Sequence, residues 1–137
     1  LGLDSICSVC EYQEPLPLND IAKKLDAEVI YGRTDITIWG YTLIDSLKAI
    51  VEMLPDQFQK IYGRSTARAL IFTGVHTGRS SMVAVRVSNL KPGAVVLQGM
   101  EPVDVDPIAV RIAEVENIPL LTTHFSVDEI TSALSKG

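Results

Sequence analysis

Hydrophobic residues recur in the second half of the chain as three short runs, each of a length suited to a buried strand. The runs are Ala69 to Thr73, Ala94 to Gln98 and Leu120 to Thr122, about 25 residues apart. Each run is followed by a loop and then by residues that favour the start of a helix. Strands that alternate with helices in this way predict a parallel sheet with right-handed crossovers.

The helix expected after the first run extends from Ser80 to Leu90. Val83, Val85 and Val87 alternate with other residues there as they would in a strand. The helix is preferred because the strands on either side need a crossover to run parallel. Such a helix would be apolar on nearly all sides. It should therefore be covered by protein on two opposite sides, for example by a second subunit on one of them.

The two later helices have clearer start signals. Asp106 is the predicted N-cap of one, with Pro107 at its first position. Ser126 and Glu129 have the spacing of a capping box at the start of the last helix. The apolar residues expected on one face of the helix that follows Asp106 are Ile108, Ile112 and Val115.

The first half of the chain predicts two helices and a β-hairpin. Asn19 is the expected N-cap of a short helix over Asp20 to Leu25. Glu28 to Tyr31 and Asp35 to Tyr41 are expected to pair as a hairpin, because the second segment alternates apolar and polar residues. A longer helix is predicted from Ile44 to Leu54. The residues expected on one face of the first helix are Ile21, Ala22 and Leu25.

These elements predict one α/β domain, a three-layer α/β/α arrangement with a mainly parallel sheet. The chain has 137 residues, which allows a single compact domain. Pro15 and Pro17 end the opening segment, so residues 1–18 are assigned to an N-terminal segment or linker and residues 19–137 to the domain. Because the chain begins at Leu1 rather than Met, we expect it to be processed, trimmed or cut from a longer protein.

Charge and hydrophobicity exclude several classes of function. Lys and Arg number 12 and Asp and Glu number 17, giving a net charge of −5 that offers no general attraction to nucleic acid or an anionic membrane. Charged residues, Gly and Pro interrupt every apolar stretch before it could span a bilayer. A cytoplasmic protein is therefore expected. Cys7 and Cys10 lack the further ligands of a zinc site and are expected to be reduced thiols.

A candidate ligand site follows from the predicted sheet. In an open parallel sheet, ligands bind beyond the carboxyl ends of the strands, where helix N-termini and free backbone N–H groups gather. Glycines let the backbone approach an anion there, and Arg79 supplies a charge that suits a phosphate. The candidate ligand-binding residues are Thr73, Gly74, His76, Thr77, Gly78, Arg79, Ser80, Ser81, Gly99, Thr123 and His124.

Two interpretations of the loop from Thr73 to Ser81 stay open. It binds an anion, or Gly74 and Gly78 shape a turn and the serines cap the helix. It is not a P-loop, because Thr73 and Arg79 stand where that motif needs Gly and Lys. Phosphoryl transfer is therefore not expected.

Other constellations are weaker. His76 and His124 follow the ends of the first and third of the predicted parallel strands, with Glu101 or Asp104 nearby. Polar loop residues are a better account of them than a metal site, and no metal or cofactor is expected. No G-x-S-x-G nucleophile elbow is present, so an enzyme is the minority hypothesis. Trp39 is a candidate for stacking on a ligand base, and packing in the core or at an interface is the alternative interpretation.

Three stretches resemble the DRTGG domain family, whose fold is similar to the N-terminal domain of HPr kinase/phosphorylase and is described as MurF-like. They are residues 32–40 (Gly-Arg-Thr-Asp-Ile-Thr-Ile-Trp-Gly), residues 94–102 with their strand, glycine and Glu-Pro step, and residues 117–126, which begin Asn-Ile-Pro-Leu-Leu-Thr-Thr. The Asp-Arg-Thr-Gly-Gly run itself is absent, and its nearest equivalents are residues 74–79 and 98–100.

The resemblance implies a regulatory domain that occurs alone or attached to other domains and is not itself catalytic. Two hypotheses follow. In the favoured one, the domain senses a phosphorylated or nucleotide-like small molecule. In the alternative, it is a homodimerisation or protein-interaction module without a ligand, joined through the helix from Ser80 to Leu90 or through a sheet edge.

Overall fold

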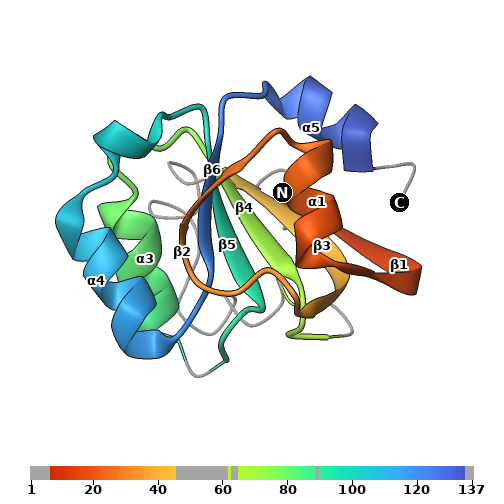
Figure 1. Cartoon of the computed structure of the whole chain (residues 1–137), viewed down its shortest axis with the longest axis horizontal. Helices are drawn as coiled ribbons and strands as arrows, with labels where there is room; N and C mark the ends of the chain where they lie inside the picture. The colour runs from red at the N-terminus through yellow and green to blue at the C-terminus, as the bar shows by residue number, and fades with distance from the viewer. Residues whose placement is uncertain (1–6, 46–61, 63–64, 89, 135–137) are drawn as a thin grey trace.

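A mixed sheet of six strands forms the centre of the molecule (Figure 1). The structure is a computed structural model that describes residues 7–45, 62, 65–88 and 90–134. Four central strands run parallel, and an antiparallel strand lies at each edge. In sheet order, the strands are β1 (Cys7–Pro17), β3 (Thr37–Asp45), β4 (Ala69–Thr73), β5 (Ala94–Gln98), β6 (Leu120–Thr123) and β2 (Glu28–Tyr31).

The three strands predicted from the short apolar runs are confirmed. β4, β5 and β6 are parallel neighbours, with Ile71 opposite Val96 and Val96 opposite Leu121. Their residues are buried almost throughout because helices cover both faces of the sheet at this point. A continuous apolar run is therefore the pattern expected of a central parallel strand.

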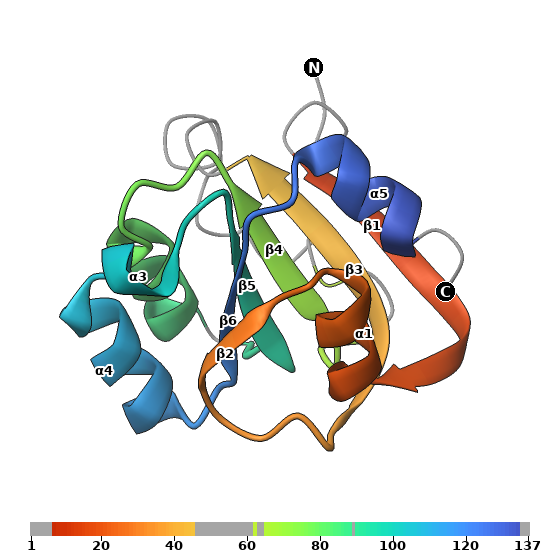
Figure 2. The same cartoon turned by 45° about the horizontal axis from the view of Figure 1, so that its top comes forward.

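Helices lie on both faces of the sheet, as the turned view in Figure 2 shows. On one face α3 packs beside α4, and on the other α1 lies close to α5. Among the described residues, no helix has the length and apolar character needed to cross a membrane. The helices are α1 (Leu18–Lys24), α3 (Arg79–Val87), α4 (Pro107–Glu116) and α5 (Val127–Leu134), with a short 3-10 helix η3 (Pro102–Asp104) before α4.

Two hydrophobic cores result, one on each face of the sheet. Alternate residues of β4 point to opposite sides, so Leu70 and Phe72 join the core under α3 and α4, while Ala69 and Ile71 join the core under α1 and α5. The central strands therefore hold both helical layers in place.

The predicted hairpin is wrong, although both of its strands exist. β2 pairs with β6, and β3 pairs with β1 and β4. Gly32, just after β2, packs so closely on Pro119 that a Cβ there would lie 2.6 Å from the Pro119 Cα atom. Local alternation identifies strands but not their partners, and this contact between distant residues belongs to the pairing of β2 with β6.

The opening segment also differs from the prediction. Residues 7–17, which the sequence analysis left outside the domain, form β1 and pair along β3. Helix α1 begins at Leu18 after Pro17, so Asn19 lies inside its first turn and is not the N-cap. The predicted buried face is correct, since Ile21, Ala22 and Leu25 are all buried.

The faces of α3 and α4 are only partly as predicted. The segment after β4 is a helix, but Val83 and Val87 are 42% and 75% exposed. In α4 the residues in the core are Ala109, Ile112 and Ala113, whereas Ile108 and Val115 lie largely in solvent. The buried face of α4 thus carries two alanines beside Ile112, and the larger Ile108 and Val115 are 42% and 54% exposed. Of the helix predicted from Ile44 to Leu54, Ile44 and Asp45 belong to β3, and residues 46–54 lie outside the described residues.

The predicted helix starts in the second half are confirmed. The Asp106 side chain accepts a hydrogen bond from the Ile108 N–H at 2.8 Å, which caps α4. Ser126 and Glu129 exchange the two hydrogen bonds of a capping box, at 3.0 and 3.2 Å. The backbone hydrogen bond from Ser126 is the main reason that the pKa of Glu129 is lowered.

Asp106→Ala is expected to lower the free energy of unfolding by about 1 kcal/mol, because it removes the N-cap acceptor of α4. Urea denaturation measures this change. Asn19→Ala is the control and should change stability much less, since Asn19 is not the cap of α1. Equal losses in the two variants would contradict the assignment of the caps.

Candidate functional site

The loops that follow β4, β5 and β6 are joined at one edge of the sheet, called here the carboxyl edge (residues 73–81, 99–106 and 123–126). The Asp106 N–H donates to the Thr77 carbonyl oxygen at 2.9 Å, linking the first and second loops. The Gly99 N–H donates to the Thr123 carbonyl at 2.7 Å, linking the second and third. The structure therefore brings together the segments that the sequence analysis expected to meet.

Three glycines shape the carboxyl edge. Gly74, Gly78 and Gly99 have φ angles of +71°, +80° and +80°, a left-handed conformation that favours glycine. A Cβ at Gly78 would lie 2.5 Å from Leu97 Cδ1, so this glycine also lets the start of α3 approach β5. No atom of the described residues lies within 4 Å of such a Cβ at Gly74 or Gly99, and both glycines are exposed, so their backbone is accessible to a ligand.

The start of α3 is open to an external acceptor. Its N-cap is Gly78, which has no side chain, and the Thr77 hydroxyl accepts a hydrogen bond from the Arg79 N–H at 3.4 Å. This bond is long and therefore weak, so the N–H stays available to a stronger acceptor. Arg79 and Ser80 are exposed. Within the part of the chain that the structure describes, the Arg79 guanidinium has no ion-pair partner, so its charge is available at this edge.

The predicted site residues divide into two groups. Three of the hydroxyl residues serve the fold: Thr73 donates to the Ile44 carbonyl at 3.3 Å, Thr123 donates to the Leu25 carbonyl at 2.7 Å, and Ser81 is buried. Gly78 is buried as well. The members that are exposed at the carboxyl edge are Gly74, His76, Thr77, Arg79, Ser80, Gly99 and His124.

His124 is paired with Asp26, at 3.0 Å between Nε2 and Oδ2. The hydrogen bond that the ring donates to the Asp26 carboxylate is the main reason that the pKa of the imidazole is raised above its ordinary value of 6.5, and the negative charges of Asp26, Glu101 and Glu129 raise it further. The described residues contain no cluster of three His, Cys, Asp or Glu side chains that could hold a metal ion. The pair instead joins the turn after α1 to the loop after β6.

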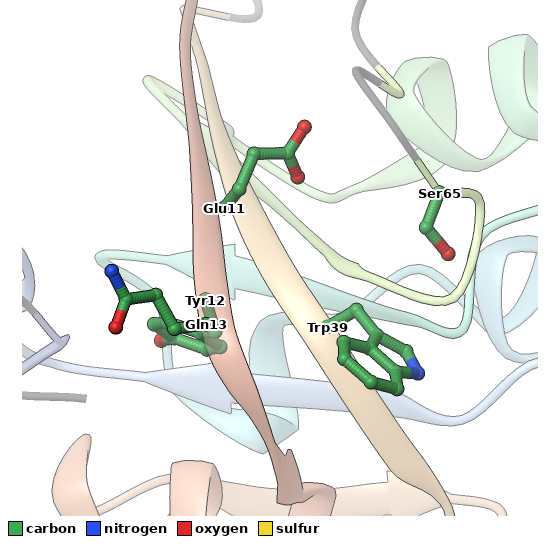
Figure 3. Close-up of a pocket in the computed structure, with 5 residues that line it drawn as sticks. All are labelled: Glu11, Tyr12, Gln13, Trp39 and Ser65. Atoms are coloured by element: carbon green, nitrogen blue, oxygen red, sulfur yellow. The ribbon is translucent and has the colours of Figure 1, made fainter.

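Two cavities lie away from the candidate anion-binding loop. One, of about 440 Å³, is beside α5 and is lined by Phe125, Asp128, Glu129, Ser132 and Ala133. The other, of about 410 Å³, lies near the start of β3 and is called here the Trp39 cavity (Figure 3). Its lining residues are Glu11, Tyr12, Gln13, Trp39 and Ser65.

Trp39 was singled out from the sequence, but its companions in the cavity were not. Trp39 is 44% exposed, while Tyr41, two residues later, is 2% exposed and packs against Tyr12. Glu11 and Gln13 belong to β1, and Ser65 precedes β4. These three are brought together only by the pairing of distant strands, and no local sequence signal marks them.

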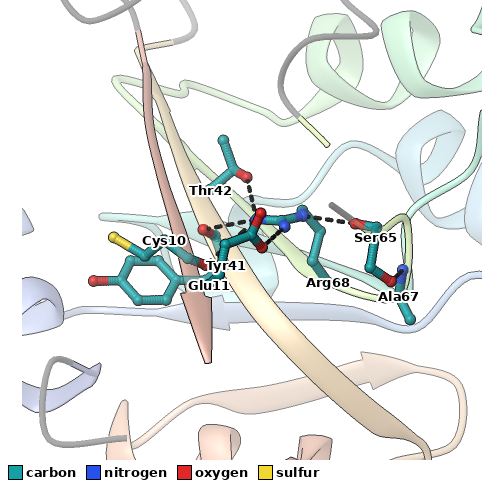
Figure 4. A network of polar contacts seen from close by, with 7 residues as sticks. All are labelled: Cys10, Glu11, Tyr41, Thr42, Ser65, Ala67 and Arg68. Atoms are coloured by element: carbon teal, nitrogen blue, oxygen red, sulfur yellow. Dashed lines mark hydrogen bonds and ion pairs between the residues drawn. The ribbon is translucent and has the colours of Figure 1, made fainter. Parts of the chain in front are cut away.

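A buried arginine lies next to this cavity (Figure 4). The Arg68 side chain is fully buried, and it forms an ion pair with Glu11. Arg68 Nε donates to the Ser65 carbonyl at 2.8 Å. Its Nη1 atom donates to the Tyr41 carbonyl, the Thr42 hydroxyl and the Cys10 carbonyl, at 3.2, 3.1 and 3.4 Å. The arginine thereby fastens β1 and β3 to the start of β4.

Gly40 makes room for this arrangement. A Cβ at this position would lie 2.3 Å from the Cys10 carbonyl oxygen and 3.3 Å from Arg68 Nη1. Any side chain would therefore push β1 away from β3 and disturb the guanidinium. The Trp-Gly-Tyr sequence combines an exposed indole, a close strand contact and a buried phenol in three consecutive residues.

Comparison with known sequences finds longer relatives. The chain is 47% identical over 136 residues to an uncharacterized HTH-type transcriptional regulator of Methanocaldococcus jannaschii, and 43% identical over 132 residues to one of Archaeoglobus fulgidus. These matches cover 98% and 96% of this chain but only 56% and 57% of the relatives. The chain thus spans just over half the length of the curated relatives it matches. No protein-family model matches it.

Comparison with solved structures finds a similar fold. The regulatory region of Clostridium perfringens pyrophosphatase, comprising CBS and DRTGG domains in complex with the activator diadenosine tetraphosphate, matches with a TM-score of 0.57 and 14% sequence identity. The match covers 85% of this chain and 45% of that chain. It supports the DRTGG-like fold that the sequence resemblance implied.

Arg68→Ala is expected to lower the free energy of unfolding by about 3 kcal/mol, because it leaves several carbonyl groups and Glu11 without the buried guanidinium. Arg33→Ala is the matched control, since Arg33 pairs with Asp35 on the surface, with side chains 81% and 63% exposed, and its removal should change stability far less. Urea denaturation compares the two. A loss at Arg68 no larger than that at Arg33 would contradict its role as a clamp.

Asp26→Asn is expected to lower the pKa of His124 toward its ordinary value. Asparagine tolerates the left-handed backbone of Asp26, whose φ is +48°. Because the native pKa is raised, the pair stabilises the fold fully below about pH 6.5, and this contribution is lost as the pH rises through the native pKa.

The measurement is a proton NMR titration of the His124 ring, with Asp128→Asn as a control carboxylate that is not among the groups raising this pKa. Unfolding of Asp26→Asn should differ from that of the original chain more at about pH 5 than at about pH 9. An unchanged His124 pKa in Asp26→Asn would show that the two side chains do not interact in solution.

Proposed function

We propose that this chain is a non-catalytic, ligand-sensing domain that binds a phosphorylated or nucleotide-like small molecule at the carboxyl edge of its sheet. The observation that carries the proposal is that hydrogen bonds link the loops after β4, β5 and β6. These loops expose backbone at Gly74 and Gly99, and they carry Arg79, whose guanidinium has no ion-pair partner among the described residues. The site is assigned to the exposed members of the predicted set, with Thr73, Gly78, Ser81 and Thr123 shaping it from within.

The chemistry of the carboxyl edge suits an anion. The N-cap Gly78 offers no side-chain acceptor to α3, and the hydrogen bond from the Arg79 N–H to the Thr77 hydroxyl is long. The partial positive charge of this helix N-terminus favours a phosphate oxygen. The Arg79 guanidinium lies at the same helix end and is able to bind two phosphate oxygens at once. The exposed hydroxyls of Thr77 and Ser80 add further donors.

A regulatory role is supported by the comparisons. The relatives are named as HTH-type transcriptional regulators, and the similar structure is a regulatory region in complex with a dinucleotide activator. We assign ligand sensing to this domain and DNA contact to the part of such a regulator that this chain does not span, since the net charge of −5 disfavours DNA here. A cytoplasmic location follows from that role. We also propose a finer fold assignment. Residues 19–137, together with β1, form a three-layer arrangement like that of MurF and of the N-terminal domain of HPr kinase.

A second candidate function is homodimerisation through α3. Val83 and Val87 are one helical turn apart, and both are exposed. An exposed apolar stripe on a helix is suited to covering by a second copy. This function is compatible with ligand binding, because the same helix begins at the carboxyl edge.

Adenine nucleotides and simple phosphate esters are expected to raise the melting temperature of the chain. A ligand at 100 times its dissociation constant stabilises the folded state by about 2.7 kcal/mol, which corresponds to several degrees for a chain of this size. Arg79→Ala should weaken binding about tenfold or more, since a hydrogen bond to a charged group contributes about 1.5 to 3 kcal/mol. Thermal shift and calorimetric titration measure both effects.

Arg111→Ala is the control for this experiment. Arg111 is 76% exposed and pairs with Glu114 on α4, so its removal changes the net charge by the same amount without touching the carboxyl edge. If no compound in the panel stabilises the chain, or if the two arginine variants lose affinity equally, the proposed site is wrong.

A further inference from the structure

The Trp39 cavity lies at the opposite end of β3 from the carboxyl edge. Trp39 is the third residue of β3, whereas Asp45 at its other end is aligned with Thr73. At about 3.3 Å per residue, six residues place Trp39 about 20 Å from the proposed anion site. A ligand in this cavity would therefore occupy a site separate from the one proposed above.

The cavity combines a flat aromatic surface with hydrogen-bonding groups. In Figure 3 the Trp39 indole, the Glu11 carboxylate and the Ser65 side chain lie on the same side of the β1 ribbon. The Ser65 Oγ atom accepts the Ala67 N–H at 3.0 Å, which leaves its own hydrogen for donation. The volume of about 410 Å³ is within the usual range for small-molecule sites.

The Glu11 carboxylate is held in position by its partner. It forms an ion pair with Arg68, a side chain that is itself fully buried and fixed by hydrogen bonds to β3 and to Ser65. A carboxylate has about four lone-pair sites, so it is able to accept from a ligand as well as from Arg68. Because Arg68 offsets much of its charge, a cationic ligand gains less here than beside an unpaired carboxylate. A cation also has a larger desolvation cost than a neutral N–H donor, which favours the neutral donor.

We infer that the Trp39 cavity binds a neutral, planar heteroaromatic ring of the nucleobase type that presents N–H donors along its edge. The ring stacks on the Trp39 indole, an arrangement that contributes about 1 to 3 kcal/mol for nucleobases. Its N–H groups donate to the Glu11 carboxylate, and a ring acceptor takes the Ser65 hydroxyl. Two adjacent donors on one edge, as in guanine, fit a carboxylate better than the donor and acceptor edge of adenine.

Intrinsic fluorescence tests this inference directly, because Trp39 is the only tryptophan in the chain. Guanosine, which carries no phosphate, is the probe, and inosine has the same ring system without the exocyclic amine. Guanosine is expected to quench Trp39 fluorescence along a saturable curve. Inosine should bind about tenfold more weakly, since it loses a hydrogen bond to a charged group. Free N-acetyltryptophanamide corrects for collisional quenching.

Two variants keep the fluorescent residue and change the hydrogen bonds. Glu11→Gln retains an oxygen for Arg68 but replaces one acceptor with a donor, so the preference for guanosine over inosine should disappear. Ser65→Ala should weaken guanosine binding severalfold, and it provides the test if Glu11→Gln melts below the assay temperature. Arg79→Ala is the control and should leave guanosine quenching unchanged, so the two proposed sites fail or succeed independently.

A quench that rises linearly with guanosine and matches that of N-acetyltryptophanamide would overturn the inference. So would saturable binding that Ser65→Ala leaves unchanged and that does not distinguish guanosine from inosine. Loss of guanosine quenching in Arg79→Ala would instead move the nucleoside to the carboxyl edge.

Discussion

The buried guanidinium of Arg68 is the interaction on which the assembly of the sheet depends. The Arg68 side chain donates to carbonyl groups of β1 and β3 and of Ser65. The backbone carbonyl of Arg68 accepts the N–H groups of Gly93 and Ala94 at the start of β5. Removing a charged group from water is costly unless all its donors are satisfied. Three strands must therefore be in register before this residue can be buried, which makes the edge of the sheet a cooperative unit.

The parallel strands then decide where chemistry is possible. Because β4, β5 and β6 run in one direction, their loops gather at one edge with glycines, a helix start and an arginine. The opposite end of β3 carries an exposed indole beside the Arg68 network. The two candidate sites thus have different chemistry, one suited to negative charge and the other to a flat neutral ring.

Sequence reasoning identified the parts of the fold that depend on local pattern. The runs at β4, β5 and β6, the Asp106 cap and the Ser126 capping box are visible in a few consecutive residues, and the structure has them. The predictions that failed depend on distant residues. β2 was expected to form a hairpin with the next strand but pairs with β6, and the Thr123 hydroxyl, expected in the ligand site, donates to the Leu25 carbonyl oxygen. The Trp39 cavity was not predicted for the same reason. One of its lining residues, Glu11, belongs to β1, which lies outside the expected domain.

The two edge strands have a consequence for how the chain acquires its structure. β1 and β2 precede the other described strands along the chain, yet β2 finds its partner only in β6, with Glu28 opposite Thr122. Pairings of such high sequence separation form slowly, because the intervening chain must be ordered before the contact repays the loss of entropy. Because the ribosome makes a chain from its N-terminus, β2 stays without its partner until β6, the last described strand, has been synthesised. Completion of the sheet is therefore a late event, in which β2 pairs with a strand about 90 residues further along the chain.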